Sequence, residues 1–176
     1  MPKINRNGVD IHYETYGEGP VVFLTHGFSA TSKMWYGQIE SISEDYRLVI
    51  WDMRGHGSSD YPDDISLYSE KETVADILFI LDELGVKEAT IGGMSLGGYM
   101  SLAFYKNYPD RVNSLLIVDT GPGFKNETAR KEWNDYALSS AKKFEQTGLE
   151  SLKGRSKEMD AKNHSNAKGL SLAARG

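Results

Sequence analysis

The sequence predicts an α/β fold, with a mostly parallel, twisted sheet and helices flanking it. Short, continuously apolar segments alternate along the chain with amphipathic helical segments. Continuous apolar runs are typical of parallel strands that are buried on both faces. Since parallel neighbours are joined by right-handed crossovers, this alternation of strand and helix indicates one parallel sheet.

Five segments are expected to form strands. Residues 9–16 alternate apolar with polar side chains, which predicts a half-exposed antiparallel edge strand with His12 at the surface. The other four are continuous apolar runs, and they predict buried parallel strands at residues 21–25, 48–51, 89–91 and 115–118.

The clearest helix is expected at residues 70–84, where apolar side chains recur along one face. These side chains are Val74, Ile77, Leu78, Leu81 and Leu84. Ser69 and Glu72 have the spacing of a capping box at its start, and Gly85 is a favourable residue to end it. A second helix is expected over residues 96–107.

The sequence changes character near residue 120, which predicts two regions. Residues 1–120 contain the expected strands and form the core of an α/β-type domain, and residues 121–176 are expected to begin a helical cap or lid. Residues 127–146 predict an amphipathic helix, and the side chains on its apolar side are Trp133, Tyr136, Ala137, Ser140, Ala141 and Phe144. Beyond that helix the sequence is polar with only scattered apolar residues.

The composition excludes several classes of function. There are 20 basic and 25 acidic side chains, a net charge of −5, and no cluster of Lys or Arg that would bind nucleic acid. No apolar run is long enough for a membrane span, and the first residues lack the apolar stretch of a signal peptide. The absence of cysteine excludes disulfides, thiolate metal ligands and a cysteine nucleophile. We therefore expect a cytoplasmic protein that binds neither nucleic acid nor a membrane.

The segment Gly92-Gly93-Met94-Ser95-Leu96-Gly97-Gly98 directly follows one expected strand and directly precedes an expected helix. It contains G-x-S-x-G, the pattern of a nucleophile elbow, in which a serine on a tight strand-to-helix turn exposes its hydroxyl. Gly93 and Gly97 are needed sterically, because the strand and the helix approach too closely for side chains there. The pattern alone arises by chance in roughly one chain of this length in twenty, so its context carries the interpretation.

Two further turns follow other expected strands. Thr25-His26-Gly27-Phe28 follows the run at 21–25, and Asp52-Met53-Arg54-Gly55-His56-Gly57-Ser58-Ser59 follows the run at 48–51. With the elbow, these turns resemble the α/β-hydrolase superfamily, in the branch of esterases, perhydrolase-type haloperoxidases, enol-lactonases and carbon–carbon bond hydrolases. The resemblance covers roughly residues 8–120 and implies the α/β-hydrolase fold, truncated before its seventh and eighth strands. A nucleotide-binding α/β domain is rejected, because neither G-x-G-x-x-G nor G-x-x-x-x-G-K is present.

The resemblance implies roles for individual residues. Ser95 is the expected nucleophile, and the backbone N–H groups of Phe28 and Leu96 are the expected oxyanion hole. The residues expected to shape the pocket and its loops are His26, Gly27, Gly93, Met94 and Gly97. A serine at the elbow argues against an epoxide hydrolase or a haloalkane dehalogenase, which use a carboxylate nucleophile. No metal and no organic cofactor are expected, since the chemistry needs only serine, histidine, an acid and backbone donors.

A serine hydroxyl needs an imidazole base, and a carboxylate that orients the imidazole. In this superfamily the acid normally follows the seventh strand and the histidine the eighth, so the resemblance places neither within these residues. Asp119, at the end of the sixth strand, is a minor candidate for the acid, since a residue there more often ties down the next loop. His56 is expected to be hydrogen-bonded within its turn, and His164 is not expected to be the base.

These observations predict a serine hydrolase that acts on a small carboxylic ester or lactone, with its base and acid missing from this chain. The alternative is a catalytically incomplete α/β-hydrolase-fold fragment, or a protein that binds a small ligand on the same scaffold. The strand at 113–118 is expected to lack a neighbour on one side. Its apolar edge predicts self-association or a complementing second chain.

Overall fold

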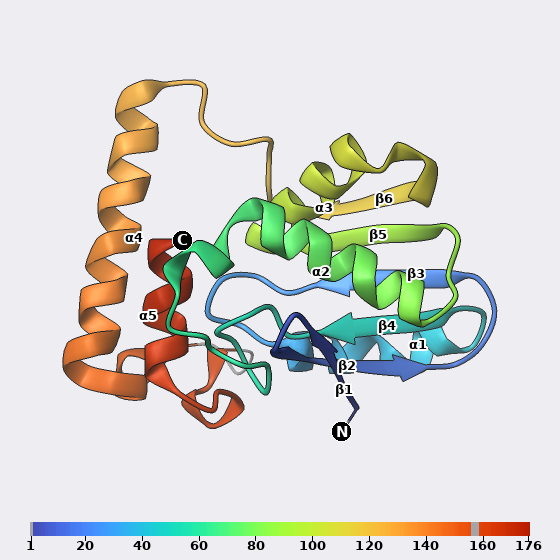
Figure 1. Cartoon of the computed structure of the whole chain (residues 1–176), viewed down its shortest axis with the longest axis horizontal. Helices are drawn as coiled ribbons and strands as arrows, with labels where there is room; N and C mark the ends of the chain where they lie inside the picture. Colours follow the sequence, from blue (N-terminus) through green and yellow to red (C-terminus); the bar gives the residue numbers. More distant parts are fainter. Residues whose placement is uncertain (1, 156–158) are drawn as a thin grey trace.

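The computed structural model describes residues 2–155 and 159–176. It contains a six-stranded sheet in the order β1-β2-β4-β3-β5-β6 (Figure 1). The strands are β1 (Lys3–Arg6), β2 (Val9–Tyr16), β3 (Val21–Thr25), β4 (Arg47–Trp51), β5 (Ala89–Met94) and β6 (Val112–Val118). Strands β4, β3, β5 and β6 run parallel to one another, while β2 pairs antiparallel with both β1 and β4. The predicted α/β class and its four parallel strands are confirmed.

Five α-helices accompany the sheet within the described residues. They are α1 (Ile39–Ser43), α2 (Glu70–Glu83), α3 (Leu96–Asn107), α4 (Glu127–Thr147) and α5 (Ala167–Arg175). Short 3₁₀ segments lie at Ser32–Gln38, Ile65–Tyr68, Pro109–Arg111, Gly148–Leu152 and Ala161–Asn163. None of the helices in the described ranges combines the length and the apolar character needed to cross a bilayer.

The two faces of the sheet are covered by different helices, as expected for parallel strands that are apolar on both sides. On one face Phe23, Trp51 and Ile91 pack with the apolar stripes of α2 and α3. On the other face Leu24 and Ile50, among others, pack with residues of Ser32–Gln38 and α1. The sheet is therefore the middle layer, with α2 and α3 on one side and the shorter α1 segment on the other (Figure 1).

The prediction for the first strand is wrong in two respects. Strand β2 is antiparallel but is not an edge strand, because β1 pairs along its outer side. His12 is consequently buried, with 1% of its surface exposed, and its Nε2 lies 3.0 Å from Glu14 Oε1. The polar four-residue strand β1 has no apolar run to mark it, so the sequence offered no signal that β2 had a second neighbour.

Helix α2 begins and ends where its sequence predicts. The Ser69 side chain accepts a hydrogen bond from the Glu72 N–H, and Gly85, with φ +66°, follows the helix in the left-handed conformation. The reciprocal half of the capping box does not form. Instead the Glu72 carboxylate binds the guanidinium of Arg6 on β1.

The region after residue 120 forms a pair of helices beside the sheet (Figure 1). Helix α4 is present as predicted, but of the expected apolar side only Ala141 and Phe144 are buried, while Trp133 and Tyr136 are 50% and 52% exposed. Helix α5, which the sequence analysis did not anticipate, packs against α4 and has Asn166 as its N-cap. It has only nine residues and follows a polar segment, so no long apolar pattern marked it in the sequence.

Candidate active site

Three turns meet at the carboxyl ends of the parallel strands. The turn after β3 carries His26-Gly27-Phe28, the turn after β4 carries residues 52–59, and the turn after β5 carries Ser95. These strand ends point toward the side of the molecule where α4 and α5 lie (Figure 1). Ligands of open α/β sheets bind outside the carboxyl ends of the strands, so this is the expected place for a site.

Ser95 occupies the junction between β5 and α3 in a strained conformation. Its φ is +52° and its ψ is −117°, values that a non-glycine residue rarely adopts. Its N–H donates to Val118 O at 3.0 Å, which ties the junction to the end of β6. The residue is partly exposed, and its hydroxyl caps no helix N–H group. This is the tight strand-to-helix turn that the G-x-S-x-G pattern predicts.

The glycines around Ser95 permit a very close approach of three chain segments. A Cβ atom at Gly97 would overlap the carbonyl oxygen of Thr25, and one at Gly93 would lie 2.6 Å from the same oxygen. A Cβ at Gly27 would lie 3.6 Å from the Cβ of Ser95. The end of β3 is therefore in direct contact with the elbow, and the turn at 26–28 lies against Ser95.

Two backbone N–H groups in the turns around Ser95, those of Phe28 and Leu96, have no hydrogen-bond partner among the described residues. Leu96 is the first residue of α3, and the first N–H groups of a helix have no partner within it. Neither the Leu96 N–H nor the Phe28 N–H donates a hydrogen bond to another group within residues 2–155 and 159–176. The positive end of the helix dipole adds to the attraction for negative charge at this place.

His26 lies beneath this turn and does not face a substrate. Its ring is fully buried, with Nδ1 2.7 Å from Gly27 O and Nε2 accepting a hydrogen bond from Met53 N at 3.0 Å. Burial lowers the pKa of His26, which is therefore neutral at neutral pH. The imidazole connects the turn after β3 to the turn after β4.

The remaining histidines near the turns are also engaged on both nitrogens. His56 Nδ1 lies 3.1 Å from Arg54 O, and its Nε2 accepts from Ser29 N at 3.2 Å. His164 Nε2 lies 3.0 Å from Ser29 O, and its Nδ1 accepts from Gly57 N at 3.3 Å. Burial lowers the pKa of His164 to about 4, and burial also holds the pKa of His56 well below its usual value. No described histidine in these turns retains a free ring nitrogen that could accept a proton from Ser95.

Neither His12 nor Asp119 is paired with a second catalytic residue in the described part of the chain. His12 is on β2, which β4 and β3 separate from β5 in the sheet, and it pairs with Glu14. Asp119 follows β6 with φ +48° and an exposed side chain. In the described part of the chain, its carboxylate makes no hydrogen bond or ion pair with a histidine.

The turn after β4 is held by buried charges that sequence reasoning did not connect. Asp52 accepts hydrogen bonds from Ser32 N at 2.7 Å and Ser58 N at 2.8 Å. Arg54 makes two hydrogen bonds of 2.7 and 2.8 Å with the Asp76 carboxylate on α2, and Arg6 Nε also binds Asp76, at 2.6 Å. No local pattern links these residues, because the pairing depends on how α2 and β1 pack.

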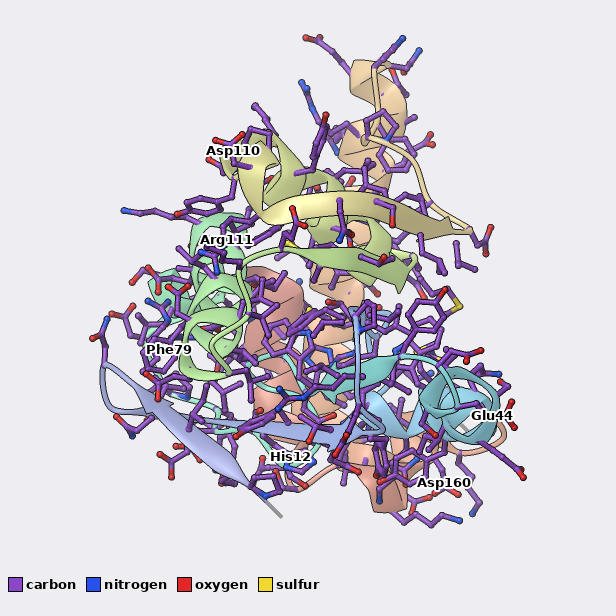
Figure 2. The ribbon with its side chains drawn as sticks, turned by 90° about the vertical axis from the view of Figure 1, so that its right-hand side faces the viewer. His12, Glu44, Phe79, Asp110, Arg111 and Asp160 are labelled. Atoms are coloured by element: carbon purple, nitrogen blue, oxygen red, sulfur yellow. The ribbon has the colours of Figure 1, made fainter. Side chains whose placement is uncertain are left out.

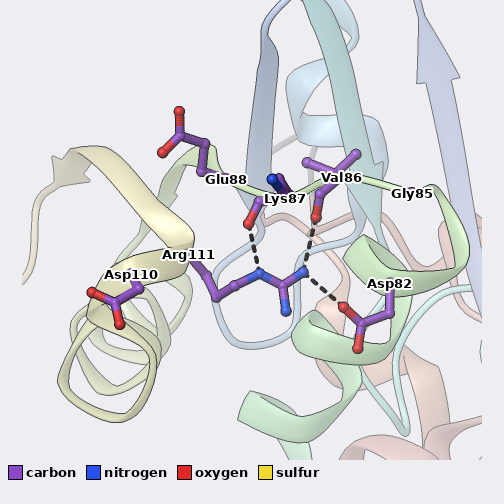
Figure 3. A pocket seen from close by; sticks show the side chains of 7 residues that line it. All are labelled: Asp82, Gly85, Val86, Lys87, Glu88, Asp110 and Arg111. Carbon is purple, nitrogen blue, oxygen red and sulfur yellow. Dashed lines mark hydrogen bonds and ion pairs between the residues drawn. The ribbon is translucent and has the colours of Figure 1, made fainter.

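A surface hollow of about 770 Å³ lies at the opposite end of the sheet, where Asp110 and Arg111 face the viewer in Figure 2. Arg111 fills its hydrogen bonds there with Lys87 O, Val86 O and the Asp82 carboxylate (Figure 3). These bonds tie the start of β6 to the loop before β5. The polar groups of Arg111 in this hollow therefore serve to hold the two segments together. Within the described ranges, no three His, Asp or Glu side chains gather as metal ligands.

The chain is similar to a known protein family and to several solved structures. Residues 20–172 match the model of the alpha/beta hydrolase fold. The chain belongs to the α/β-hydrolase fold family. A thermophilic esterase from Thermogutta terrifontis superimposes with a TM-score of 0.83 and 23% identity, covering 100% of this chain and 72% of that chain. An enol-lactonase from Burkholderia xenovorans superimposes with a TM-score of 0.77 and 21% identity, covering 99% and 72%.

The sequence relatives of this hydrolase-fold chain are named for several different activities. It is 35% identical over 114 residues to epoxide hydrolase 3 of Siraitia grosvenorii, covering 64% of this chain and 36% of that protein. It is 32% identical over 126 residues to a putative 2-succinyl-6-hydroxy-2,4-cyclohexadiene-1-carboxylate synthase of Bacillus subtilis, covering 69% and 46%. The chain therefore spans less than half the length of these relatives. Its homologues support a hydrolase, and they include the epoxide hydrolases that the sequence analysis disfavoured.

Proposed function

We propose that this chain carries the nucleophile and the oxyanion hole of a serine hydrolase acting on small carboxylic esters or lactones. The observation that carries the proposal is Ser95 itself, a serine with φ +52° between β5 and α3. Attack of its Oγ on an ester carbonyl carbon would form a tetrahedral oxyanion. The N–H groups of Phe28 and Leu96, unpaired within the described residues, would stabilise that charge, and each such donor contributes about 3–4 kcal/mol in comparable sites.

The identity of the residue at the elbow favours an ester over an epoxide. A carboxylate that opens an epoxide forms an ester, which water can hydrolyse in a second step. A serine alkoxide that opened an epoxide would form an ether, which water does not cleave under the same conditions. Ser95 can therefore turn over an acyl substrate but not an epoxide, although several relatives are named epoxide hydrolases.

The proposal requires a base and an acid from outside the described residues. His26, His56 and His164 each use both ring nitrogens on backbone groups, and the burial of each lowers its pKa. Another polypeptide segment, in the same protein or in a second chain, would supply the histidine and its carboxylate. Without that segment the chain remains a catalytically incomplete fragment, or a protein that binds a ligand on this scaffold.

A fluorophosphonate probe tests the proposal directly. Ser95 Oγ would bond to phosphorus as fluoride leaves, and its proton would pass to the base. Where the segment with the histidine and its carboxylate is present, we expect intact-mass spectrometry to show one adduct, which Ser95→Ala removes and which the control Ser114→Ala, on the exposed strand β6, retains. Under the same conditions we expect p-nitrophenyl acetate to be hydrolysed and styrene oxide to remain unopened.

Other results would reject the assignment or its alternatives. An adduct that persists in Ser95→Ala would show that another residue is the nucleophile. The absence of any adduct in the wild-type chain would favour the incomplete fragment or the ligand-binding protein. Opening of styrene oxide that depends on Ser95 would contradict the ester assignment.

A further inference from the structure

Ser29, the residue after the proposed oxyanion donor Phe28, has an unusual conformation and environment. Its φ is +57°, in the left-handed region that favours glycine, and none of its surface is exposed. A non-glycine residue keeps such a conformation only where its surroundings hold it. The surroundings of Ser29 therefore decide the shape of the turn that presents the Phe28 N–H.

Two imidazole rings hold the backbone of Ser29, one on each polar group. The Ser29 N–H donates to His56 Nε2 at 3.2 Å, and the Ser29 carbonyl accepts from His164 Nε2 at 3.0 Å. The second nitrogen of each ring is fixed as well, since His56 Nδ1 donates to Arg54 O and His164 Nδ1 accepts from Gly57 N. Each ring donates through one nitrogen and accepts through the other, so both are neutral and each has one defined tautomer.

One of the two rings, that of His56, also contacts Phe28. The turn is closed by a hydrogen bond from Ala30 N to Gly27 O at 3.1 Å, with Phe28 and Ser29 as its two central residues. A positive φ at the second central position is typical of a type II turn, and glycine or asparagine is preferred there. The Phe28 ring meets His56 edge to face, with ring centroids 5.7 Å apart. The turn cannot rotate without breaking these contacts.

We propose that His56 and His164 are positioning residues, which hold Ser29 in its left-handed conformation and so direct the Phe28 N–H toward the oxyanion formed at Ser95. This inference rests on the proposed function, because it assumes that the Phe28 N–H binds the oxyanion. His164 comes from the region beyond α4, 135 residues from Ser29 in sequence. The fold of that region is thereby coupled to the geometry of the oxyanion hole.

Two substitutions of His164 separate its two hydrogen bonds. The amide nitrogen of glutamine can replace Nε2, so His164→Gln keeps a donor for Ser29 O. The amide oxygen of asparagine can replace Nδ1, so His164→Asn keeps an acceptor for Gly57 N but loses the bond to Ser29. A merely structural role of the buried ring would affect both variants alike.

Amide hydrogen exchange of Ser29, followed by NMR in the whole chain, measures the clamp without any reaction. We expect exchange about tenfold faster than wild type in His164→Asn and within about threefold of wild type in His164→Gln. Equal exchange in the two variants, or wild-type exchange in His164→Asn, would overturn the proposal. If His164→Asn does not fold, Ser29→Gly in the same background is the second variant. Glycine takes the left-handed conformation unaided, so the double variant should fold, and its failure to do so would count against the proposal.

The rate of fluorophosphonate labelling at Ser95 connects the clamp to chemistry. We expect His164→Asn to lower the second-order rate constant by about tenfold or more and His164→Gln to leave it within about twofold. Ser29→Gly should restore most of the rate lost in His164→Asn. If wild-type Ser95 does not react at all, the proposed function fails for this chain, and the amide exchange alone decides whether the two histidines hold Ser29.

Discussion

The turns after β3, β4 and β5 and the strand β6 belong to the same sheet but differ in how their surroundings hold them. In the three turns several buried polar groups are paired across large sequence distances, as Arg54 is with Asp76 and His164 with the Ser29 carbonyl. Among the described residues strand β6 pairs only with β5, and its residues Leu115 to Val118 are 36–39% exposed. Helix α4 likewise leaves Trp133 half exposed.

Different forces therefore act in these two parts of the chain. At the turns, hydrogen bonds to buried groups determine one backbone geometry, since an unpaired buried polar group is costly. At β6, apolar side chains and unpaired strand groups remain open to solvent, and such an edge favours pairing with another strand. Substitutions should therefore affect folding strongly in the first region and association in the second.

The largest effect is expected at Asp76, the carboxylate that two arginines share. Asp76→Asn removes the fully buried carboxylate that both Arg6 and Arg54 bind and leaves only the partly exposed Glu72 beside them. Breaking a buried pair in this way costs about 3–5 kcal/mol. The matched control is Asp82→Asn, on the same helix, because Asp82 is 55% exposed and pairs with Arg111 at the surface. That substitution should cost about 1 kcal/mol or less. Urea unfolding measures both, and equal losses would show that burial of the network adds nothing.

The framework of both regions is predictable from sequence because it depends on local patterns. Continuous apolar runs predict the four parallel strands, and Ser69 and Gly85 predict the limits of α2. The G-x-S-x-G segment predicts a tight turn at Ser95, because glycine is the residue that such a close approach admits.

What the sequence does not predict depends on tertiary packing. Strand β1 has no apolar run, so His12 was expected at the surface although it is buried. The Asp76 carboxylate is one of many on amphipathic helices, and nothing near it in sequence indicates two arginine partners. His164 lies in a polar segment, and its contact with Ser29 exists only because α4 and α5 bring that segment back to the sheet.

The second-largest effect is expected on acidification, which should lower the free energy of unfolding through His164. The pKa of His164 is lowered by burial, and further by His26 and Lys33, while the Ser29 carbonyl and Asp52 act in the opposite direction; the result is about 4. The unfolded chain therefore binds a proton near pH 6.5 that the folded chain resists until about pH 4. The contribution of neutral His164 to the free energy of unfolding is fully present above pH 6.5 and is lost as the pH falls from there to about 4. It amounts to about 3 kcal/mol.

Unfolding free energies measured at several pH values in wild type and His164→Gln isolate this contribution. Carboxylates titrate in both proteins, so their effect cancels in the difference. We expect the wild type to lose more stability than the variant between pH 6.5 and 4. Parallel pH profiles would mean that His164 does not titrate differently in the folded and unfolded chain.

The smallest effect on folding, and the clearest effect on association, is expected at β6. Leu116 is 39% exposed on a strand whose outer backbone groups are unpaired in the described chain, whereas Leu138 is 43% exposed on the helix α4. Either leucine replaced by lysine should change the free energy of unfolding by about 0.5 kcal/mol or less, as is usual at exposed positions. Only Leu116→Lys places a charge on an open sheet edge, where lysine opposes strand pairing.

Sedimentation velocity over a range of concentrations separates the two leucines. We expect wild type and Leu138→Lys to associate with rising concentration and Leu116→Lys to remain monomeric. A wild-type chain that is monomeric throughout would show that this edge does not recruit a second strand. If association is instead lost in Leu138→Lys and kept in Leu116→Lys, the association occurs through the exposed apolar side chains of α4 and not through the edge of β6.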